Sequence, residues 1–220
     1  MSQAPPQPTS LVQFYHRFLD DENVADFIAS VSERYALTTL QKLCAWPDRP
    51  TRRGALLALS FLGDIRHNEV LGRALSDDDR GVRMIAESGI EELWMRDGTP
   101  PQRQLLKRIR RLNAAGETDL SARLANRLVD AAPRIAEAWN QRAIALYLRG
   151  NYVAAAKDCR QTLRINPFHY RAMIGCAHCQ LEFSDPIGAL RSFRAALEVN
   201  PNLEAIRSQI RYLAQALEEL

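Results

Sequence analysis

The chain has 220 residues, of which 46% are hydrophobic, 25% charged and 7% aromatic. These proportions exclude a disordered, collagen-like or low-complexity chain, and no apolar run reaches the length of a membrane-spanning helix. The net charge of +3 divides unevenly, because residues 1–98 carry 11 basic and 15 acidic side chains while residues 99–220 carry 18 and 11. This change of sign predicts two modules with different surfaces.

The N-terminal residues contain three prolines, and we expect residues 1–8 to form a disordered tail. They show neither a basic start nor an apolar stretch, which argues against a secretory signal. The four cysteines are therefore expected to be reduced thiols in a cytoplasmic protein. Two helices, near 9–19 and 22–33, are predicted to follow as an N-terminal cap.

A weak repeat occupies the rest of the first half. Asp48 and Arg53 recur thirty residues later as Asp78 and Arg83, and each arginine opens an apolar helix. Aspartates placed before a helix cap its free backbone N–H groups. We expect helix pairs at about 35–63 and 68–95. This alternation resembles HEAT-like repeats, which occur in many bacterial scaffold proteins, and assigns residues 9–98 to that class.

The second half shows a stronger period of 34 residues. Asp97-Gly98-Thr99-Pro100-Pro101 ends the first half, with residues 99–101 as a short linker. After it, prolines recur at 133, 167 and 201, and turn residues at Gly116, Gly150 and Ser184. Each interval contains two apolar stripes at helical spacing, separated by the turn residue. The period predicts three helical hairpins, at 102–135, 136–169 and 170–203, and a capping helix at 204–220.

These hairpins resemble the tetratricopeptide repeat (TPR). The resemblance is carried by Trp139, Ala143, Gly150, Tyr152, Ala155 and Pro167, and in the next unit by Ala177, Ala189, Phe193, Ala196 and Pro201. It implies that residues 102–220 are three TPR-like units with a capping helix. The predicted fold class is all-α: an α-α superhelix (α-solenoid) of antiparallel helix pairs, HEAT-like and then TPR-like.

The sequence offers little for catalysis or cofactor binding. It lacks a glycine-rich phosphate loop, a Gly-x-Ser-x-Gly elbow and a His-Glu-x-x-His motif. Cys176 and Cys179, with Cys159 on the preceding helix, could hold zinc or act as a redox pair, but no second Cys-x-x-Cys exists. The TPR register explains them as inward-facing core residues. We therefore expect no enzyme activity and no cofactor, and keep a metal or redox role as an alternative.

The basic segment 103–111 is the strongest electrostatic feature. Contact with a phosphate backbone is one possible role for it, although no aromatic side chains are interleaved with the arginines for stacking. Nucleic-acid binding is accordingly kept as an alternative function.

The resemblance to TPR proteins implies a concave groove lined by the first helix of each pair. Carried over by position, the candidate lining is Arg103, Lys107, Arg110, Asn140, Gln141, Ile144, Tyr147, Arg171, His178 and Tyr212. The basic members are expected to lie on one surface and to attract an acidic protein or peptide. Some family members clamp a C-terminal carboxylate, but this chain keeps only Arg171 and, loosely, Gln141 of that pattern. The predicted function is a non-catalytic protein-binding scaffold or adaptor.

Overall fold

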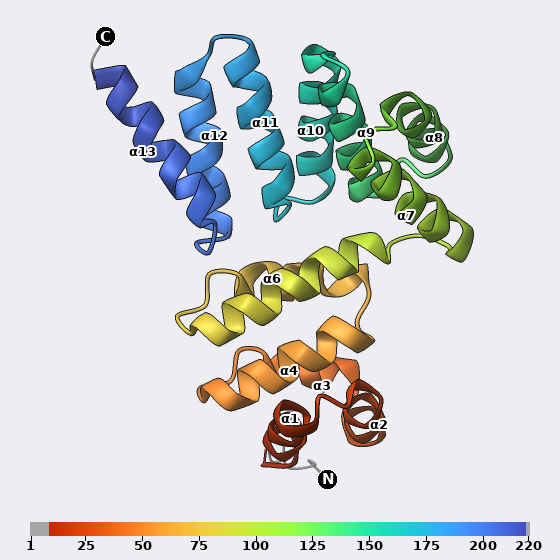
Figure 1. Cartoon of the computed structure of the whole chain (residues 1–220). Coiled ribbons are helices and arrows are strands. Elements are labelled where there is room, and N and C mark those ends of the chain that lie inside the picture. Colours follow the sequence, from red (N-terminus) through yellow and green to blue (C-terminus); the bar gives the residue numbers. More distant parts are fainter. Residues whose placement is uncertain (1–8, 219–220) are drawn as a thin grey trace. The chain divides into compact units, whose positions relative to one another are not determined.

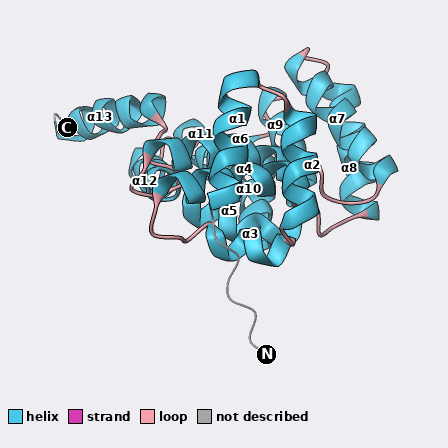
Figure 2. Cartoon of the chain, turned by 90° about the horizontal axis from the view of Figure 1, so that it is seen from below, coloured by secondary structure: helices cyan, strands magenta, loops and turns pink. Residues whose placement is uncertain are grey.

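The computed structural model describes residues 9–218, and every regular element in that range is a helix (Figure 2). The fold class is therefore all-α, as predicted. None of the helices between Thr9 and Glu218 has the length and apolar composition to cross a membrane. The tail predicted for residues 1–8 lies outside the described residues.

Two compact units make up the chain, the first ending at Leu93 and the second beginning at Trp94. This division falls before the predicted boundary at residue 98, because Met95 packs in one core cluster with Leu106 and Ile109. The elements of the first unit are α1 (Thr9–Asp21), α2 (Val24–Arg34), α3 (Leu37–Leu43), α4 (Arg49–Leu62), the 3-10 helix η1 (Ile65–His67), α5 (Asn68–Ala74) and α6 (Arg80–Met95), whose last two residues belong to the second unit.

The first unit is built around α4, which contacts α1, α2 and α3. Gly54 allows α4 to pack closely against α1, since a Cβ atom at this position would lie only 3.2 Å from the Cβ of Tyr15 on α1. The core side chains are almost fully buried: Leu11, Phe27, Val31, Leu40, Leu56, Leu59 and Leu71.

The Asp/Arg repeat has a different register from the one that the sequence predicts. Asp48 accepts the Thr51 N–H at 2.9 Å at the start of α4, and Asp79, rather than Asp78, accepts the Val82 N–H at 2.9 Å at the start of α6. Both are N-cap interactions of the same form. The equivalent aspartates are therefore 31 residues apart.

The arginine that corresponds to Arg83 is likewise Arg52, not Arg53. Arg52 Nη1 donates to two carbonyl groups five and six residues before it, and Arg83 Nη1 does the same. Arg53 has another role, since its guanidinium makes two 2.7 Å hydrogen bonds to the carboxylate of Asp79. This pair joins the start of α4 to the start of α6. The HEAT-like assignment itself stays a prediction.

The second unit is an α-solenoid of antiparallel helix pairs that follow one another in sequence order (Figure 1). Its first helix begins at Pro100, so two residues of the predicted linker form the first turn of that helix, where proline is well tolerated. The helices are α7 (Pro100–Ala114), α8 (Thr118–Ala131), α9 (Ala136–Leu148), α10 (Tyr152–Ile165), α11 (Tyr170–Glu182), α12 (Pro186–Val199) and α13 (Glu204–Glu218).

The turn residues predicted from the 34-residue period share one backbone conformation. Gly116 and Gly150 both have φ of 74°, and Ser184 at the third position has φ of 55°. Each turn therefore needs the left-handed region, which only glycine adopts without steric cost. The period in the sequence thus reflects a geometric requirement of the hairpin.

Candidate functional site

The helix α7 carries five basic side chains and no acidic one: Arg103, Lys107, Arg108, Arg110 and Arg111. Leu106 and Ile109 are fully buried on its other side, in the core cluster formed with α8. Packing of these two side chains fixes which face of α7 points outward, because residues three or four apart share a face. Arg103, Lys107 and Arg110 follow this spacing and lie together.

The positive charges of α7 have no acidic partner within residues 9–218, where none of the five forms an ion pair. Two other arginines of the second unit, by contrast, are neutralised. Arg142 makes two hydrogen bonds to Asp158, at 2.6 and 2.8 Å, and Arg149 pairs with Asp119 at 2.9 Å. The basic side chains of α7 are therefore exposed or half-buried and are not neutralised by the described residues.

A buried carboxylate occupies the start of α9. Glu137 is 6% exposed and accepts hydrogen bonds from Gln141 Nε2 at 2.6 Å, from Asn140 Nδ2 at 3.2 Å and from His169 Nε2 at 2.8 Å. Burial raises the pKa of Glu137, but the His169, Gln141 and Asn140 donors outweigh it, so the pKa is lowered and the carboxylate stays ionised.

The His169 ring completes this arrangement. Its Nδ1 accepts the Ala172 N–H at 3.2 Å and caps α11, which places the ring proton on Nε2, facing Glu137. The indole of Trp94 stacks on the ring, with centroids 3.9 Å apart and planes inclined by 14°. His169 is thus held by one contact on each edge and one on its face.

A second buried link joins α7, α8 and α9. Asn113 Nδ2 donates to the carbonyl and side-chain oxygens of Gln141, both at 2.9 Å, and Ser121 Oγ donates to Asn113 Oδ1 at 2.5 Å. Gln141 therefore has its amide nitrogen on Glu137 and its amide oxygen on Asn113. The buried side chains of Glu137, Gln141, Asn113 and Ser121 therefore satisfy one another's hydrogen-bonding groups.

Aromatic side chains gather where α9 meets α11. Tyr147 Oη lies 3.0 Å from Glu182 Oε1, and the Tyr147 ring lies 5.1 Å from that of Tyr152 and 6.3 Å from His178. Burial, followed by the neighbouring Glu182 carboxylate, raises the pKa of Tyr147 to about 12. Burial also lowers the pKa of His178, which is therefore uncharged at neutral pH.

One segment of the second unit matches a family model. The model is that of the tetratricopeptide repeat, and it covers residues 136–169, the hairpin of α9 and α10. Residues 136–169 therefore form a tetratricopeptide repeat. TPR units generally mediate protein–protein interactions and are not catalytic.

Relatives and solved structures agree with this result. A TPR repeat-containing protein of Rhizobium etli is 29% identical over 85 residues, which cover 39% of this chain and 42% of that protein. The chain thus matches less than half of the length of this relative. The first TPR of Spaghetti (RPAP3), solved with the HSP90 peptide SRMEEVD, aligns with a TM-score of 0.51 and 20% identity over 53% of this chain and 93% of that one. The likeness supports the TPR fold.

Within the TPR units, two of the predicted groove residues do not reach a surface. Asn140 and Gln141 are 3% and 5% exposed, because both amides are used to solvate the buried Glu137 carboxylate. Their interpretation as partner-binding residues is corrected accordingly. The remaining candidates have exposed or partly exposed side chains: Arg103, Lys107, Arg110, Ile144, Tyr147, Arg171, His178 and Tyr212.

The polar network was missed in the sequence, although the TPR period contains a signal for it. Asn113 in the first unit stands where the second and third units have Tyr147 and Leu181. His169 at the end of the second unit stands where the first and third units have Ile135 and Leu203. A polar side chain at a position that is apolar in the other units marks a place where the core is polar.

The cysteines of α10 and α11 are buried, as the TPR register predicts: Cys159 is 3%, Cys176 9% and Cys179 1% exposed. Among the residues that the structure describes, no group of three or more His, Cys, Asp or Glu side chains could hold a metal ion. The alternative of a metal site at Cys159, Cys176 and Cys179 is therefore not supported by the geometry.

Proposed function

We propose that this chain is a non-catalytic adaptor that binds an acidic segment of a partner protein along α7. The observation that carries the proposal is that α7 has five basic side chains and that no described residue neutralises any of them. Opposite charge on a partner would speed encounter and fix orientation, more than it would add raw affinity. TPR units supply the rigid frame on which such a surface is held.

Apolar contacts would extend the site beyond α7. Ile144 on α9 is 37% exposed and Tyr212 on α13 is 74% exposed, which is high for side chains of this size. Arg171, exposed at the start of α11, would add a further positive charge. A matching segment would alternate carboxylates with aliphatic or aromatic side chains.

A structural neighbour binds a peptide of this type, since the HSP90 peptide SRMEEVD carries three acidic side chains. We do not propose the same contacts here. Gln141, which loosely matches the position of a carboxylate-binding side chain, is engaged with Glu137 and Asn113. The proposed recognition therefore depends on the cations of α7 and not on a terminal carboxylate clamp.

The test is a charge reversal with a matched control. The variant R103E/K107E/R110E inverts the α7 surface, whereas R123E/R127E/R194E makes the same change of charge at exposed positions of α8 and α12. A photo-reactive amino acid at position 107, used in living cells, would capture whatever lies on α7. We expect captured segments rich in Asp and Glu, and binding of the purified partner lost only in the α7 variant. Equal binding by both variants would reject the proposal.

The same cations favour nucleic-acid phosphates as a second candidate. The two functions differ in their salt dependence, because release of counterions from a nucleic acid makes log affinity fall steeply and linearly with log salt. Fluorescently labelled single-stranded RNA and duplex DNA, titrated at several salt concentrations, would measure this slope. Tight binding to either, abolished by the α7 variant and unchanged in the control variant, would favour the nucleic-acid function over the adaptor.

A further inference from the structure

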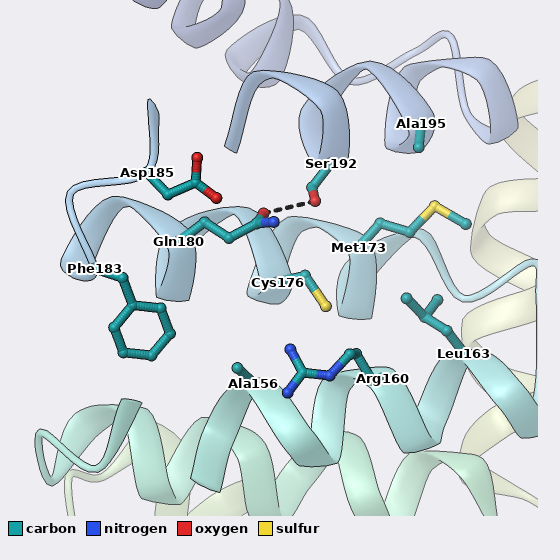
Figure 3. Close-up of a pocket in the computed structure, with 10 residues that line it drawn as sticks. All are labelled: Ala156, Arg160, Leu163, Met173, Cys176, Gln180, Phe183, Asp185, Ser192 and Ala195. Carbon is teal, nitrogen blue, oxygen red and sulfur yellow. Dashed lines mark hydrogen bonds between the residues drawn. The ribbon is translucent and has the colours of Figure 1, made fainter. Parts of the chain in front are cut away.

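A pocket of about 490 Å³ opens between α10, α11 and α12 (Figure 3). Its walls are mostly apolar, with Leu163, Met173 and Phe183 among the lining side chains, and Phe183 is 45% exposed. Met173, Cys176 and Gln180 line it from α11 at helical spacing. Arg171 and His178 each lie two residues from a member of this row, which is about 200° round the helix. The pocket is therefore on the face of α11 opposite to Arg171 and His178.

The floor of the pocket contains a thiol. Cys176 is 9% exposed, and Figure 3 shows its sulfur and the Arg160 guanidinium directed toward the same space. Cys159 lies directly behind it, because Cys159 and Cys176 pack in one core cluster. The Cys159 Sγ atom packs closely against α11, because a Cβ atom at Gly175, the residue before Cys176, would lie only 2.8 Å from it.

The α10 side of the pocket carries a positive charge. Arg160 is exposed and makes no hydrogen bond or ion pair to another residue between 9 and 218. The other charged lining residue, Asp185, belongs to the turn between α11 and α12, where its carboxylate accepts the Gly188 N–H at 2.8 Å and caps α12. A small anion entering the pocket would therefore meet an unpaired guanidinium beside a thiol.

The electrostatics of the thiols agree with this geometry. The hydrogen bond from Cys159 is the largest influence on the pKa of Cys176 and lowers it against the opposing effects of burial and of Cys179, and Arg160 adds a small lowering. The pKa of Cys159 is raised by the hydrogen bonds that it makes to the neighbouring sulfurs and by burial. Cys44, which is buried in the first unit, has its pKa raised by burial to about 12. The same Cys159 hydrogen bond lowers the pKa of Cys179, but Cys179 is 1% exposed and does not line the pocket, so Cys176 is the thiol that a small molecule in the pocket would reach.

We propose that Cys176 is a site of thiol–disulfide exchange that accepts small anionic disulfides through this pocket, with Cys159 as the resolving thiol. The Cys176 thiolate attacks one sulfur of the small disulfide, which forms a mixed disulfide and releases one small thiolate. Cys159 then transfers its proton to water, and its thiolate attacks the Cys176 sulfur, which forms a Cys159–Cys176 disulfide and releases the second small thiolate. The small disulfide is reduced by two electrons and the protein is oxidised by two.

The product would covalently join α10 of one TPR unit to α11 of the next. This activity is separate from the proposed adaptor function, since none of its residues lies on α7. The reverse reaction with a small thiol restores both protein thiols, so the state of the pair would follow the thiol–disulfide balance of the surroundings.

The rate test uses the whole chain and two reagents, dithiobis(nitrobenzoic acid), which is anionic, and dithiodipyridine, which is neutral. We expect one fast phase that disappears in C176A and is unchanged in C44A. R160Q should slow the anionic reagent about three- to tenfold and the neutral reagent little, because only the former gains from the guanidinium charge. R164Q, one turn further along α10, is the matched control. An undiminished fast phase in C176A, or equal slowing of both reagents by R160Q, would overturn the proposal.

The resolving step is tested by mass spectrometry of the same reactions. Wild-type protein should release two equivalents of the small thiol and end without an adduct, and digestion should yield a peptide pair joined through Cys159 and Cys176. C159A should release one equivalent and keep the adduct on Cys176. A stable adduct on the wild-type protein, or a disulfide that includes Cys179 in place of Cys159, would contradict the role given to Cys159. Far-ultraviolet circular dichroism of each variant verifies that it is folded.

Discussion

The Nε2 atom of His169 lies 2.8 Å from Oε2 of Glu137, while the Nδ1 atom of the same ring accepts the backbone N–H of Ala172. An ionised carboxylate and a neutral imidazole satisfy both contacts at once. The pair connects the start of α9 to the start of α11, and so the first helices of two successive TPR units. Glu137 is 6% exposed and His169 is 0% exposed, so the pair is part of the core.

Replacing Glu137 with alanine should destabilise the second unit strongly. His169 Nε2, Gln141 Nε2 and Asn140 Nδ2 would lose their shared acceptor while still buried. Loss of one partner of a buried hydrogen-bonded ionic group costs about 3 kcal/mol. Urea unfolding followed by circular dichroism measures the change. Glu198→Ala, at an exposed site of α12, is the control, and an equal loss in both variants would contradict the role of Glu137.

The same carboxylate should make stability depend on pH in the acid range. The pKa of Glu137 is lowered in the folded state, so its contribution is complete above the ordinary value of 4.5 and is lost as the pH falls through the lower folded-state pKa. The difference in unfolding free energy between wild type and Glu137→Ala should therefore shrink below pH 4.5. Urea titrations at a series of pH values measure it. A difference that stays constant over the acid range would show that Glu137 is not ionised in the folded protein.

The Arg53–Asp79 pair should stabilise the first unit. Asp79→Asn keeps a side chain that can cap Val82 but removes the charge that holds Arg53 through two hydrogen bonds. We expect a loss of about 2 kcal/mol, because charge-assisted and partly buried bonds are stronger than exposed ones. The Arg53 guanidinium holds the pKa of Asp79 well below its usual range, so this loss should diminish as the pH falls below 3.8. Asp20→Asn, at an exposed position, is expected to change stability little.

Ser184→Gly should stabilise the third TPR hairpin. Ser184 is exposed and has φ of 55°, a conformation that costs an L-residue about 1 kcal/mol relative to glycine. The reciprocal change, Gly150→Ala, should destabilise by a similar amount, and no steric clash contributes, since a Cβ atom there would have nothing within 4 Å. Thermal unfolding of the two variants in parallel measures both effects. Changes of the same sign would show that backbone conformation is not the cause.

Much of the fold could be predicted from the sequence because helix termini are encoded locally. The turn residues at 116, 150 and 184 recur because each hairpin requires a left-handed residue at that place, and the family model independently matches residues 136–169. The basic character of α7 was equally accessible, since charge is a property of composition and the helical period assigns Leu106 and Ile109 to the core.

The interior partners could not be predicted in the same way. The TPR register assigns Asn140 and Gln141 to the groove face of α9, whereas their burial depends on Glu137, on His169 at the start of α11 and on Asn113 of α7. The register of Asp48 with Asp79 likewise depends on which aspartate of three consecutive ones reaches the Val82 amide. Each of these outcomes depends on side chains that are far apart in the chain and meet only after folding.

By itself, the sequence determined the all-helical class of this protein, the hairpin period of its second unit and the sign of the charge on α7. Only the tertiary structure decided which polar side chains are buried, which arginines are neutralised and that Cys176 opens into a pocket beside Arg160. The reason is the range of the interactions. Caps, turns and amphipathic stripes act over a few residues, whereas solvation of a buried carboxylate or thiol is set by neighbours from other helices.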